Sequence, residues 1–296
     1  MTLEPTYGYF QLRGQVVGMM SDRAYTEGDN GLWNRIQFGV KISSNSIVYV
    51  ELMGSKQDRV KMYKKIGKRV DKDDSITVPW SDRYSEKYSS YRNSFKVRLD
   101  IDENKEVSLF PYDSIKSIHE KLTDGTIVLI KGSLQIDEYQ NKIQEKFVIK
   151  ELYDCEFSDD SYSDEEAFFN QEIVYLSAHN GKIQTKLIYR KHGDIEIVPY
   201  EFSVKDNELI NYFTENIQPN STLRVHGVIK HYVPTETIDD NEVITGSAVK
   251  ELVITGGSTK SIIQSRYSNE DLEDDRIIGN PFEEEKHDEK VNQWGF

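Results

Sequence analysis

The sequence predicts an all-β protein built from two tandem five-stranded barrels, each with a short helix, followed by an acidic C-terminal tail that we expect to be disordered. Three observations lead to this prediction. Apolar and polar residues alternate over several stretches, as they do in half-buried β-strands. A pattern of helix, turn and strand that ends near Gly132 recurs near Gly227. The formal net charge of −14 is concentrated in two segments, which indicate a linker and a tail.

The repeat is carried by apolar spacing rather than by identical residues. In each copy, three apolar residues share one face of a short helix and three more alternate along a strand. The helical positions are Ile115, Ile118 and Leu122 in the first copy, and Ile210, Phe213 and Ile217 in the second. The strand positions are Val128, Ile130 and Leu134, and then Leu223, Val225 and Ile229. A slip of one residue would turn a strand's side chains to the wrong face, so the shared phase indicates two copies of one fold.

The elements of the first copy follow one another from the N-terminus. Residues 9–17, 33–42 and 47–52 predict three strands, each with one apolar and one polar face. The helix and two further strands follow within 115–152. A three-strand meander, a helix and two strands is the order of the OB fold, a five-stranded Greek-key barrel. The long segment at 54–108 interrupts this order, and we expect it to be an insertion on a binding face.

These patterns divide the chain into four parts. We expect the first barrel with its insertion at 1–153, an acidic linker at 154–167, the second barrel at 168–257 and the acidic tail at 258–296. Seven acidic residues and no basic residue lie between Asp154 and Glu166, and ten acidic residues face three basic ones from Ser268 onward. Such compositions are typical of solvated segments that do not fold by themselves.

Composition argues against several classes of protein. Mean hydropathy is −0.64, and no apolar run approaches the roughly 18 residues that a membrane span needs. The N-terminus has no basic stretch followed by an apolar core, so no secretory signal is expected. Cys155 is the single cysteine, which argues against a disulfide framework and a cysteine-rich zinc site. We therefore expect a cytoplasmic protein (of the host, if the source is viral) without metal or cofactor.

The insertion carries the strongest functional signal. Thirteen Lys and Arg residues face six Asp and Glu residues between Lys56 and Arg98, and aromatic residues are interleaved with them. Single-stranded nucleic acid has a charged backbone and unstacked bases, so a sequence-tolerant binding protein needs both cations and aromatic faces. The residues expected to contact it are Trp33, Arg35, Tyr49, Lys56, Arg59, Lys61, Lys64, Lys65, Lys68, Arg69, Trp80, Arg83, Tyr84, Lys87, Tyr88, Tyr91 and Arg92.

A structural interpretation of the insertion stays open beside the functional one. The lysine run could be the solvated face of a helix whose buried side holds Val60, Tyr63 and Val70. The spacing of Tyr84, Tyr88 and Tyr91 would equally suit one packed helical stripe. The insertion could also be ordinary surface or a contact between subunits of an oligomer.

The C-terminal tail is the second functional signal. It is acidic and ends in an aromatic residue with a free carboxylate, and we expect Trp294 and Phe296 to dock into a basic-rimmed pocket of a partner protein. In the absence of a partner, the tail could occupy the protein's own cationic groove and compete with nucleic acid. The alternative is a solubilising tail whose last residues have no role.

Tandem OB folds, a basic and aromatic face and an acidic tail ending in phenylalanine together resemble the single-stranded-DNA-binding proteins of bacteria and phages. The Pro-Phe ending of the bacterial tail is absent here, although Pro281-Phe282 carries that dipeptide internally. The resemblance implies a non-enzymatic protein that covers single-stranded DNA without sequence preference in replication, recombination and repair. It also implies that the tail recruits replication or recombination proteins, and that the protein could form a homo-oligomer.

Two other functional classes remain as alternatives. One is a protein-interaction, assembly or inhibitor module that uses its acidic segments to mimic nucleic acid and binds none. The other is an enzyme, for which the signals are weak. Ser258-Thr-Lys-Ser lacks the spacing of a phosphate-binding loop. The histidines at 179, 192, 226 and 231 lack metal-ligand spacing.

Overall fold

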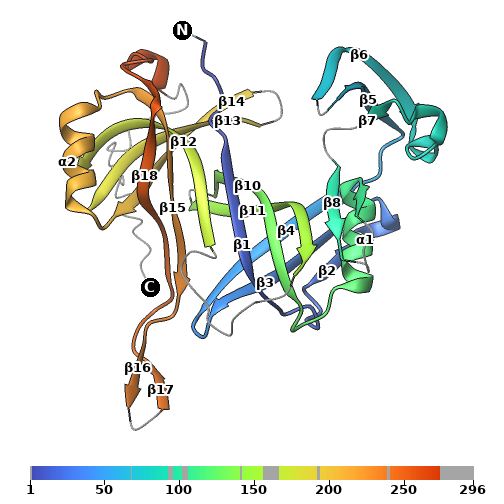
Figure 1. Cartoon of the computed structure of the whole chain (residues 1–296), viewed down its shortest axis with the longest axis horizontal. Coiled ribbons are helices and arrows are strands. Elements are labelled where there is room, and N and C mark those ends of the chain that lie inside the picture. Colours follow the sequence, from blue (N-terminus) through green and yellow to red (C-terminus); the bar gives the residue numbers. More distant parts are fainter. Residues whose placement is uncertain are drawn as a thin grey trace, which may run out of the picture.

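The computed structural model describes residues 2–67, 69–92, 96–101, 106–140, 142–155, 167–191, 194–238 and 241–273. The protein is mostly β-structure arranged as two barrels, each with one helix at the place where the sequence predicts it (Figure 1). The predicted fold class, two tandem barrels of OB type, is therefore confirmed. Among the described residues, no helix has the length and apolar character that crossing a membrane requires.

The first barrel contains the predicted strands and helix in the predicted order, together with three short strands that the sequence did not indicate. Two of these fall at the end of the segment 54–108 that we expect to be an insertion, and they join the sheet of the barrel. Its elements are β1 (Gly8–Val17), β2 (Tyr25–Glu27), β3 (Trp33–Ser43), β4 (Ser46–Ser55), β8 (Val97–Asp100), β9 (Val107–Leu109), α1 (Pro111–Lys121), β10 (Ile127–Tyr139) and β11 (Lys142–Asp154). The apolar face predicted for each strand is buried, from Phe10 and Leu12 on β1 to Val48 and Val50 on β4. The apolar residues of each alternating strand thus form the inner face of the barrel wall, and the polar residues form its outer face.

The second barrel repeats the order of three strands, a helix and two strands, and its described residues contain no counterpart of β2, β8 or β9. They are β12 (Ala167–His179), β13 (Lys182–Lys191), β14 (Asp194–Val204), α2 (Asn207–Asn216), β15 (Ser221–Tyr232) and β18 (Val249–Ile263), with β16 (Thr235–Ile238) and β17 (Asn241–Ile244) forming a hairpin between the last two. The carboxylate of Asp206 begins α2 by accepting hydrogen bonds from the amides of Glu208 and Leu209. The hairpin projects away from the barrel (Figure 1).

The two glycines that align the repeats have the same structural role. Gly132 and Gly227 lie where β10 and β15 shift register against their partner strands. A Cβ at Gly132 would lie 2.0 Å from the carbonyl oxygen of Val148, and one at Gly227 would lie 1.9 Å from that of Val253. Only glycine permits this close backbone approach at a bulge, which explains why the residue recurs.

The two barrels are joined by direct strand pairing. β1 pairs with β10 and β3 of its own barrel and also with β12 of the second barrel, from Gly8 opposite Gln171 to Leu12 opposite Ala167. A further pairing between Ser46 and Tyr232 joins β4 to β15. As a result, thirteen strands of the described residues form one continuous sheet. The barrels are therefore held together by backbone hydrogen bonds as well as by the chain connection.

The insertion forms a small sheet of its own, from β5 (Arg59–Ile66), β6 (Arg69–Pro79) and β7 (Tyr91–Arg92). The 3₁₀ turns η2 (Trp80–Asp82) and η3 (Glu86–Tyr88) connect β6 to β7. The sheet stands off one end of the first barrel (Figure 1). Its core consists of Val60, Met62 and Val78 packed on Phe110. The helical interpretation of the lysine run is wrong, because Val60 and Met62 alternate as in a strand, and the tyrosines lie in turns and on β7 rather than on one helix.

The boundary of the tail also differs from the expectation. The sequence predicts a tail from residue 258 onward, but β18 continues to Ile263 and the chain remains packed as far as the 3₁₀ turn η5 (Glu270–Leu272). Tyr267 and Leu272 are buried against the outer face of the second barrel, where Leu3 near the N-terminus also packs. The remainder of the tail, 274–296, with Trp294 and Phe296, lies outside the described residues, as does 156–166 of the expected linker.

Candidate nucleic-acid interface

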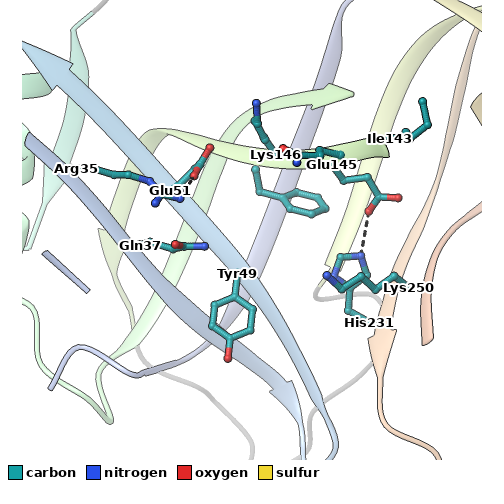
Figure 2. Close-up of a pocket in the computed structure, with 11 residues that line it drawn as sticks. Arg35, Gln37, Tyr49, Glu51, Ile143, Glu145, Lys146, His231 and Lys250 are labelled. Atoms are coloured by element: carbon teal, nitrogen blue, oxygen red, sulfur yellow. Dashed lines mark hydrogen bonds and ion pairs between the residues drawn. The ribbon is translucent and has the colours of Figure 1, made fainter. Parts of the chain in front are cut away.

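A cleft of about 550 Å³ opens on the outer face of β3 and β4, beside the second barrel. It is lined by Arg35, Gln37, Tyr49, Glu51, Ile143, Gln144, Glu145, Lys146, Phe147, His231 and Lys250. Figure 2 shows that β3 and β4 supply one wall, β11 supplies another, and His231 and Lys250 reach in from β15 and β18 of the second barrel. The cleft is therefore a joint product of the two barrels.

Strand alternation places the polar side chains in the cleft. Ile36 and Phe38 of β3 point into the barrel core, so Arg35 and Gln37 point outward. On β4, Tyr49 lies between the buried Val48 and Val50, and its side chain is 57% exposed. An exposed aromatic ring on a strand that is otherwise buried on its other face is available to stack on a flat ligand.

The electrostatics of the cleft are mixed. Arg35 Nη2 lies 2.5 Å from Glu51 Oε2, and Lys146 Nζ lies 2.6 Å from Asp137 Oδ2. Lys250 lies near enough to Glu145 to affect that carboxyl group electrostatically. The cleft thus offers three cations, each within reach of a carboxylate.

Glu145 is held by side chains of the second barrel. Its Oε2 lies 3.2 Å from His231 Nε2, shown by the dashed line in Figure 2, and the hydroxyl of Tyr200 donates to its Oε1. Burial alone would raise the pKa of Glu145, but the hydrogen bonds from His231 and Tyr200 outweigh burial and hold that pKa below its ordinary value. Burial, followed by the charge of Glu145, raises the pKa of Tyr200. This contact fixes β11 of the first barrel against the second.

Within the insertion, the aromatic residues nearest the barrel anchor the insertion to α1. The Arg83 guanidinium donates to both carboxylate oxygens of Asp113, at 3.0 and 2.9 Å, and lies 4.2 Å from the ring centre of Trp80. Tyr84 donates to the same carboxylate at 2.6 Å and accepts from the amide of Phe110 at 2.9 Å. These contacts give Trp80, Arg83 and Tyr84 a structural role in addition to any contact with nucleic acid.

Five lysines of the insertion are exposed, and several have identified partners; the five are Lys56, Lys61, Lys64, Lys65 and Lys87. Lys64 pairs with Asp74 at 2.9 Å, Tyr91 donates to the same aspartate at 3.1 Å, and Lys65 donates to the carbonyl of Ser89 at 2.6 Å. Arg59 donates to the carbonyl of Thr77 at 3.2 Å. The ammonium groups of Lys56, Lys61 and Lys87 lie over the rings of Tyr112, Tyr63 and Tyr88 respectively. Arg92 lies on β7 opposite Tyr63. Lys68 and the side chain of Arg69 lie outside the described residues.

Of the three residues expected on the outer face of the barrel strands, two meet in the cleft. Arg35 and Tyr49 line it, but Trp33 does not. The half-buried indole of Trp33 instead covers the backbone of Gly28, where a Cβ would lie 2.0 Å from the indole Nε1. A glycine five residues before a tryptophan gives no sequence signal that the ring will fold back on it.

The residues that β11 and the second barrel contribute to the cleft are not indicated by the sequence. Lys146 and Phe147 lie on a strand whose alternation could have marked Lys146 as outward-facing, but nothing indicated which surface it would face. His231 and Lys250 reach the cleft only because β1 pairs with β12 and β4 with β15. Such tertiary juxtapositions leave no local pattern in the sequence.

Several comparisons with known proteins can be set beside this geometry. A family model described as YorF matches residues 10–290. No curated protein matches the chain. Among solved structures, the wild-type single-stranded DNA binding protein from Thermus aquaticus is similar with a TM-score of 0.42 and 7% sequence identity, over 86% of this chain and 93% of that one. A deletion mutant of the same Thermus protein gives a TM-score of 0.42 and 9% identity, over 86% and 95%.

The family match runs from β1 of the first barrel, through the insertion and both helices, to beyond the end of β18 in the second. It therefore includes both walls of the cleft and the strands that join the barrels. The chain belongs to the YorF family.

Proposed function

We propose that this protein binds single-stranded DNA without sequence preference, acts without catalysis in replication, recombination or repair, and holds the strand in the cleft between the barrels. The observation that carries the proposal is the position of the exposed Tyr49 ring beside Arg35, Lys146 and Lys250 in one cleft. A sequence-tolerant site for a single strand needs an aromatic face for a base and cations for the phosphates, and the cleft supplies both.

The carboxylates in the cleft are compatible with this function. The side chains of Arg35 and Glu51 are 40% and 22% exposed, and exposed ion pairs contribute only about 0–1 kcal/mol to stability. A phosphate can therefore replace Glu51 as the partner of Arg35 at little cost. The same exchange is open to Lys64 of the insertion, whose side chain is 51% exposed in its pair with Asp74.

We further propose that the basic face of the insertion extends the binding site beyond the cleft. The residues concerned are the exposed cations Lys56, Arg59, Lys61, Lys64, Lys65 and Lys87. The acidic tail is proposed to recruit partner proteins through Trp294 and Phe296, and to compete with the strand for the cationic surface when no partner is bound.

A salt titration tests the proposed function. Binding of a fluorescently labelled oligo-dT should be measured by anisotropy at several salt concentrations, with a duplex of equal length as the control. The logarithm of the association constant should fall with log salt by about 0.7 per neutralised phosphate. We expect a slope steeper than about −2, which corresponds to three or more phosphates, and weaker binding of the duplex.

Absence of oligo-dT binding at low salt would contradict the proposed function. That result would favour the alternative, in which acidic surfaces serve protein interaction and Glu51 and Glu145 make the cleft unsuitable for phosphate. The Lys250→Ala variant adds an internal check, since loss of one phosphate contact should make the slope shallower by about 0.7.

A further inference from the structure

Two half-buried lysines of the first barrel have no carboxylate partner among the described residues. They are Lys150 of β11 and Lys96, which directly precedes β8. Burial lowers the pKa of Lys150, and burial followed by the charge of Lys65 lowers the pKa of Lys96. The cleft cations Arg35 and Lys146, by contrast, each pair with a carboxylate. A charge that is partly removed from water is costly unless an opposite charge meets it, so both lysines are candidates to bind an anion.

A bulge in β11 keeps Lys150 at the surface of the barrel. Glu151 and Ile149 pair with consecutive residues of β10, so Lys150 between them is the extra residue of the bulge. Ile149 is completely buried in the core, whereas Lys150 remains partly exposed. The Lys150 side chain is therefore accessible from outside the barrel.

The two lysines lie between the cleft and the insertion. Val148 of β11 lies opposite Glu51 of the cleft wall, and three residues further along, β11 pairs with Arg98 of β8. Lys150 lies between these two pairings, and Lys96 lies two residues before Arg98. The insertion stands off the barrel on the side of β8 (Figure 1). A strand that leaves the cleft along β11 towards the insertion thus passes both lysines.

Lys96 lies against the residues that anchor the insertion. Its Nζ lies 5.0 Å from the ring centre of Tyr84 and 5.3 Å from that of Phe110. Lys65 of β5 lies close enough to act on Lys96 electrostatically, and it donates to the carbonyl of Ser89 at 2.6 Å. Two ammonium groups of like charge are thus held near each other by uncharged partners, and an anion beside them would offset their repulsion.

We propose that Lys150 and Lys96 bind backbone phosphates of the single strand as it leaves the cleft, and that the strand continues from them to Lys65 of the insertion. The inference rests on the proposed function and deepens it, because it joins the cleft and the insertion into one continuous binding surface. Each phosphate would supply the opposite charge that neither lysine obtains from the described part of the chain, through hydrogen bonds between charged groups.

The missing counter-charge of Lys150 has a measurable consequence. Lys150→Met keeps the apolar stem of the side chain and removes a half-buried charge that has no partner among the described residues. The variant should therefore keep or raise the melting temperature of the free protein while it weakens oligo-dT binding. A lysine whose role is only structural would show the reverse, a lower melting temperature with unchanged binding.

The experiment is the oligo-dT salt titration, applied to the full chain with Lys150→Met, Lys96→Met and both substitutions together. Each lost phosphate contact should make the salt slope shallower by about 0.7, so the double variant should differ from the wild type by about 1.4. Lys260→Met, at the exposed end of β18 in the second barrel, is the matched control and should keep the wild-type slope and affinity.

Failure of this inference can be told apart from failure of the proposed function. If the wild type binds oligo-dT and the double variant keeps its salt slope, the strand does not cross the two lysines and the inference is wrong, while the proposed function stands. A change confined to Lys96→Met would also overturn the inference, because the strand would then reach the insertion by another route. If the wild type binds no oligo-dT, the proposed function fails and the inference fails with it.

Discussion

At the scale of single residues, function in the cleft depends on side chains held outward by neighbours that point inward. Tyr49 is the clearest case, because Val48 and Val50 on either side of it are completely buried and fix the direction of its ring. The ring contributes little to the core, so it can be removed without unfolding the barrel. Its effect on binding can therefore be measured separately from its effect on stability.

Replacing Tyr49 with alanine should weaken oligo-dT binding about tenfold while leaving the thermal unfolding transition unchanged. The loss of one base-stacking contact is worth about 1–3 kcal/mol. Tyr212→Ala, which removes a 39% exposed tyrosine from α2 in the second barrel, serves as the matched control and should bind like the wild type. Equal binding by the two variants would show that the strand does not stack on Tyr49.

The lowered pKa of Glu145 leads to a prediction about how the stability of the protein depends on pH. Its folded-state pKa lies below the ordinary 4.5, so its contacts with His231 and Tyr200 stabilise the protein fully only above about pH 4.5 and are lost as pH falls through the folded pKa. Glu145→Gln should reduce the free energy of unfolding at pH 7 by about 1.5–3 kcal/mol, the usual worth of hydrogen bonds to a charged group.

The measurement is urea unfolding of wild type and Glu145→Gln at pH 7 and at pH values below 4. The difference between the two proteins should shrink as pH falls, because the wild-type carboxyl group becomes protonated and then resembles the amide. A difference that stays constant over this range would mean that the charge of Glu145 adds nothing to the contact between the barrels.

At the scale of elements, the strands and helices of the barrels could be predicted and the insertion could not. Two-residue alternation and helical spacing depend only on nearby residues, and the predicted inner faces of β1, β3 and β4 are all buried. In β5, by contrast, Val60 and Met62 are followed by a run of charged residues, so a helix with few apolar positions was an equally good interpretation. The strand forms because β6 and β7 pair with it and Phe110 covers it.

The ion pair between Arg83 and Asp113 is one of the contacts that attach the insertion to α1. Arg83→Ala should destabilise that attachment by about 1.5–3 kcal/mol, because it leaves Asp113 without its two charged hydrogen bonds and Trp80 without the guanidinium that covers it. Hydrogen exchange measures this loosening. Relative to the wild type, Arg83→Ala should speed amide exchange in β5 and β6 and leave exchange in β3 and β4 unchanged. Arg83→Lys should rescue only part of the effect, since an ammonium cannot make the paired contact.

The same variant tests the contribution of the insertion to binding. If the insertion extends the site, Arg83→Ala should also weaken oligo-dT binding and make its salt slope shallower, since the cations of β5 would no longer be held in place. Unchanged binding, together with the expected faster exchange, would confine the site to the cleft. In that case Lys61 and Lys64 would be surface residues, as the structural interpretation of the sequence allowed.

At the scale of the whole molecule, most of the binding residues that the sequence failed to indicate come from the contact between the barrels. The repeat revealed that two barrels exist, yet local periodicity says nothing about which faces of the barrels meet. The strand pairing of β1 with β12 decides this, and with it the positions of His231 and Lys250 in the cleft. Similarly, Tyr267 and Leu272 fall within the tail expected at 258–296, although both are buried against the second barrel.

The buried positions of Tyr267 and Leu272 determine where the tail can be removed. A chain of residues 1–273 should keep the stability of the full protein and bind oligo-dT equally well or more tightly, because residues 274–296 contain seven acidic and three basic residues. A chain of residues 1–263 should lose about 3–6 kcal/mol of unfolding free energy, since it also lacks two fully buried side chains. Weaker DNA binding by the 1–273 chain would contradict the proposed competition between tail and strand.

Because β1 pairs with β12, the two barrels are held together independently of the covalent connection between them. A polypeptide ending at Cys155 would still present β1 as a docking edge for a second polypeptide beginning at Ala167. The five residue pairs between β1 and β12 would set the register in which the two associate. Strand addition of this kind is a common mode of association between independent chains. A nick between these two residues would thus break a covalent bond without parting the barrels, and each half could be supplied from its own gene.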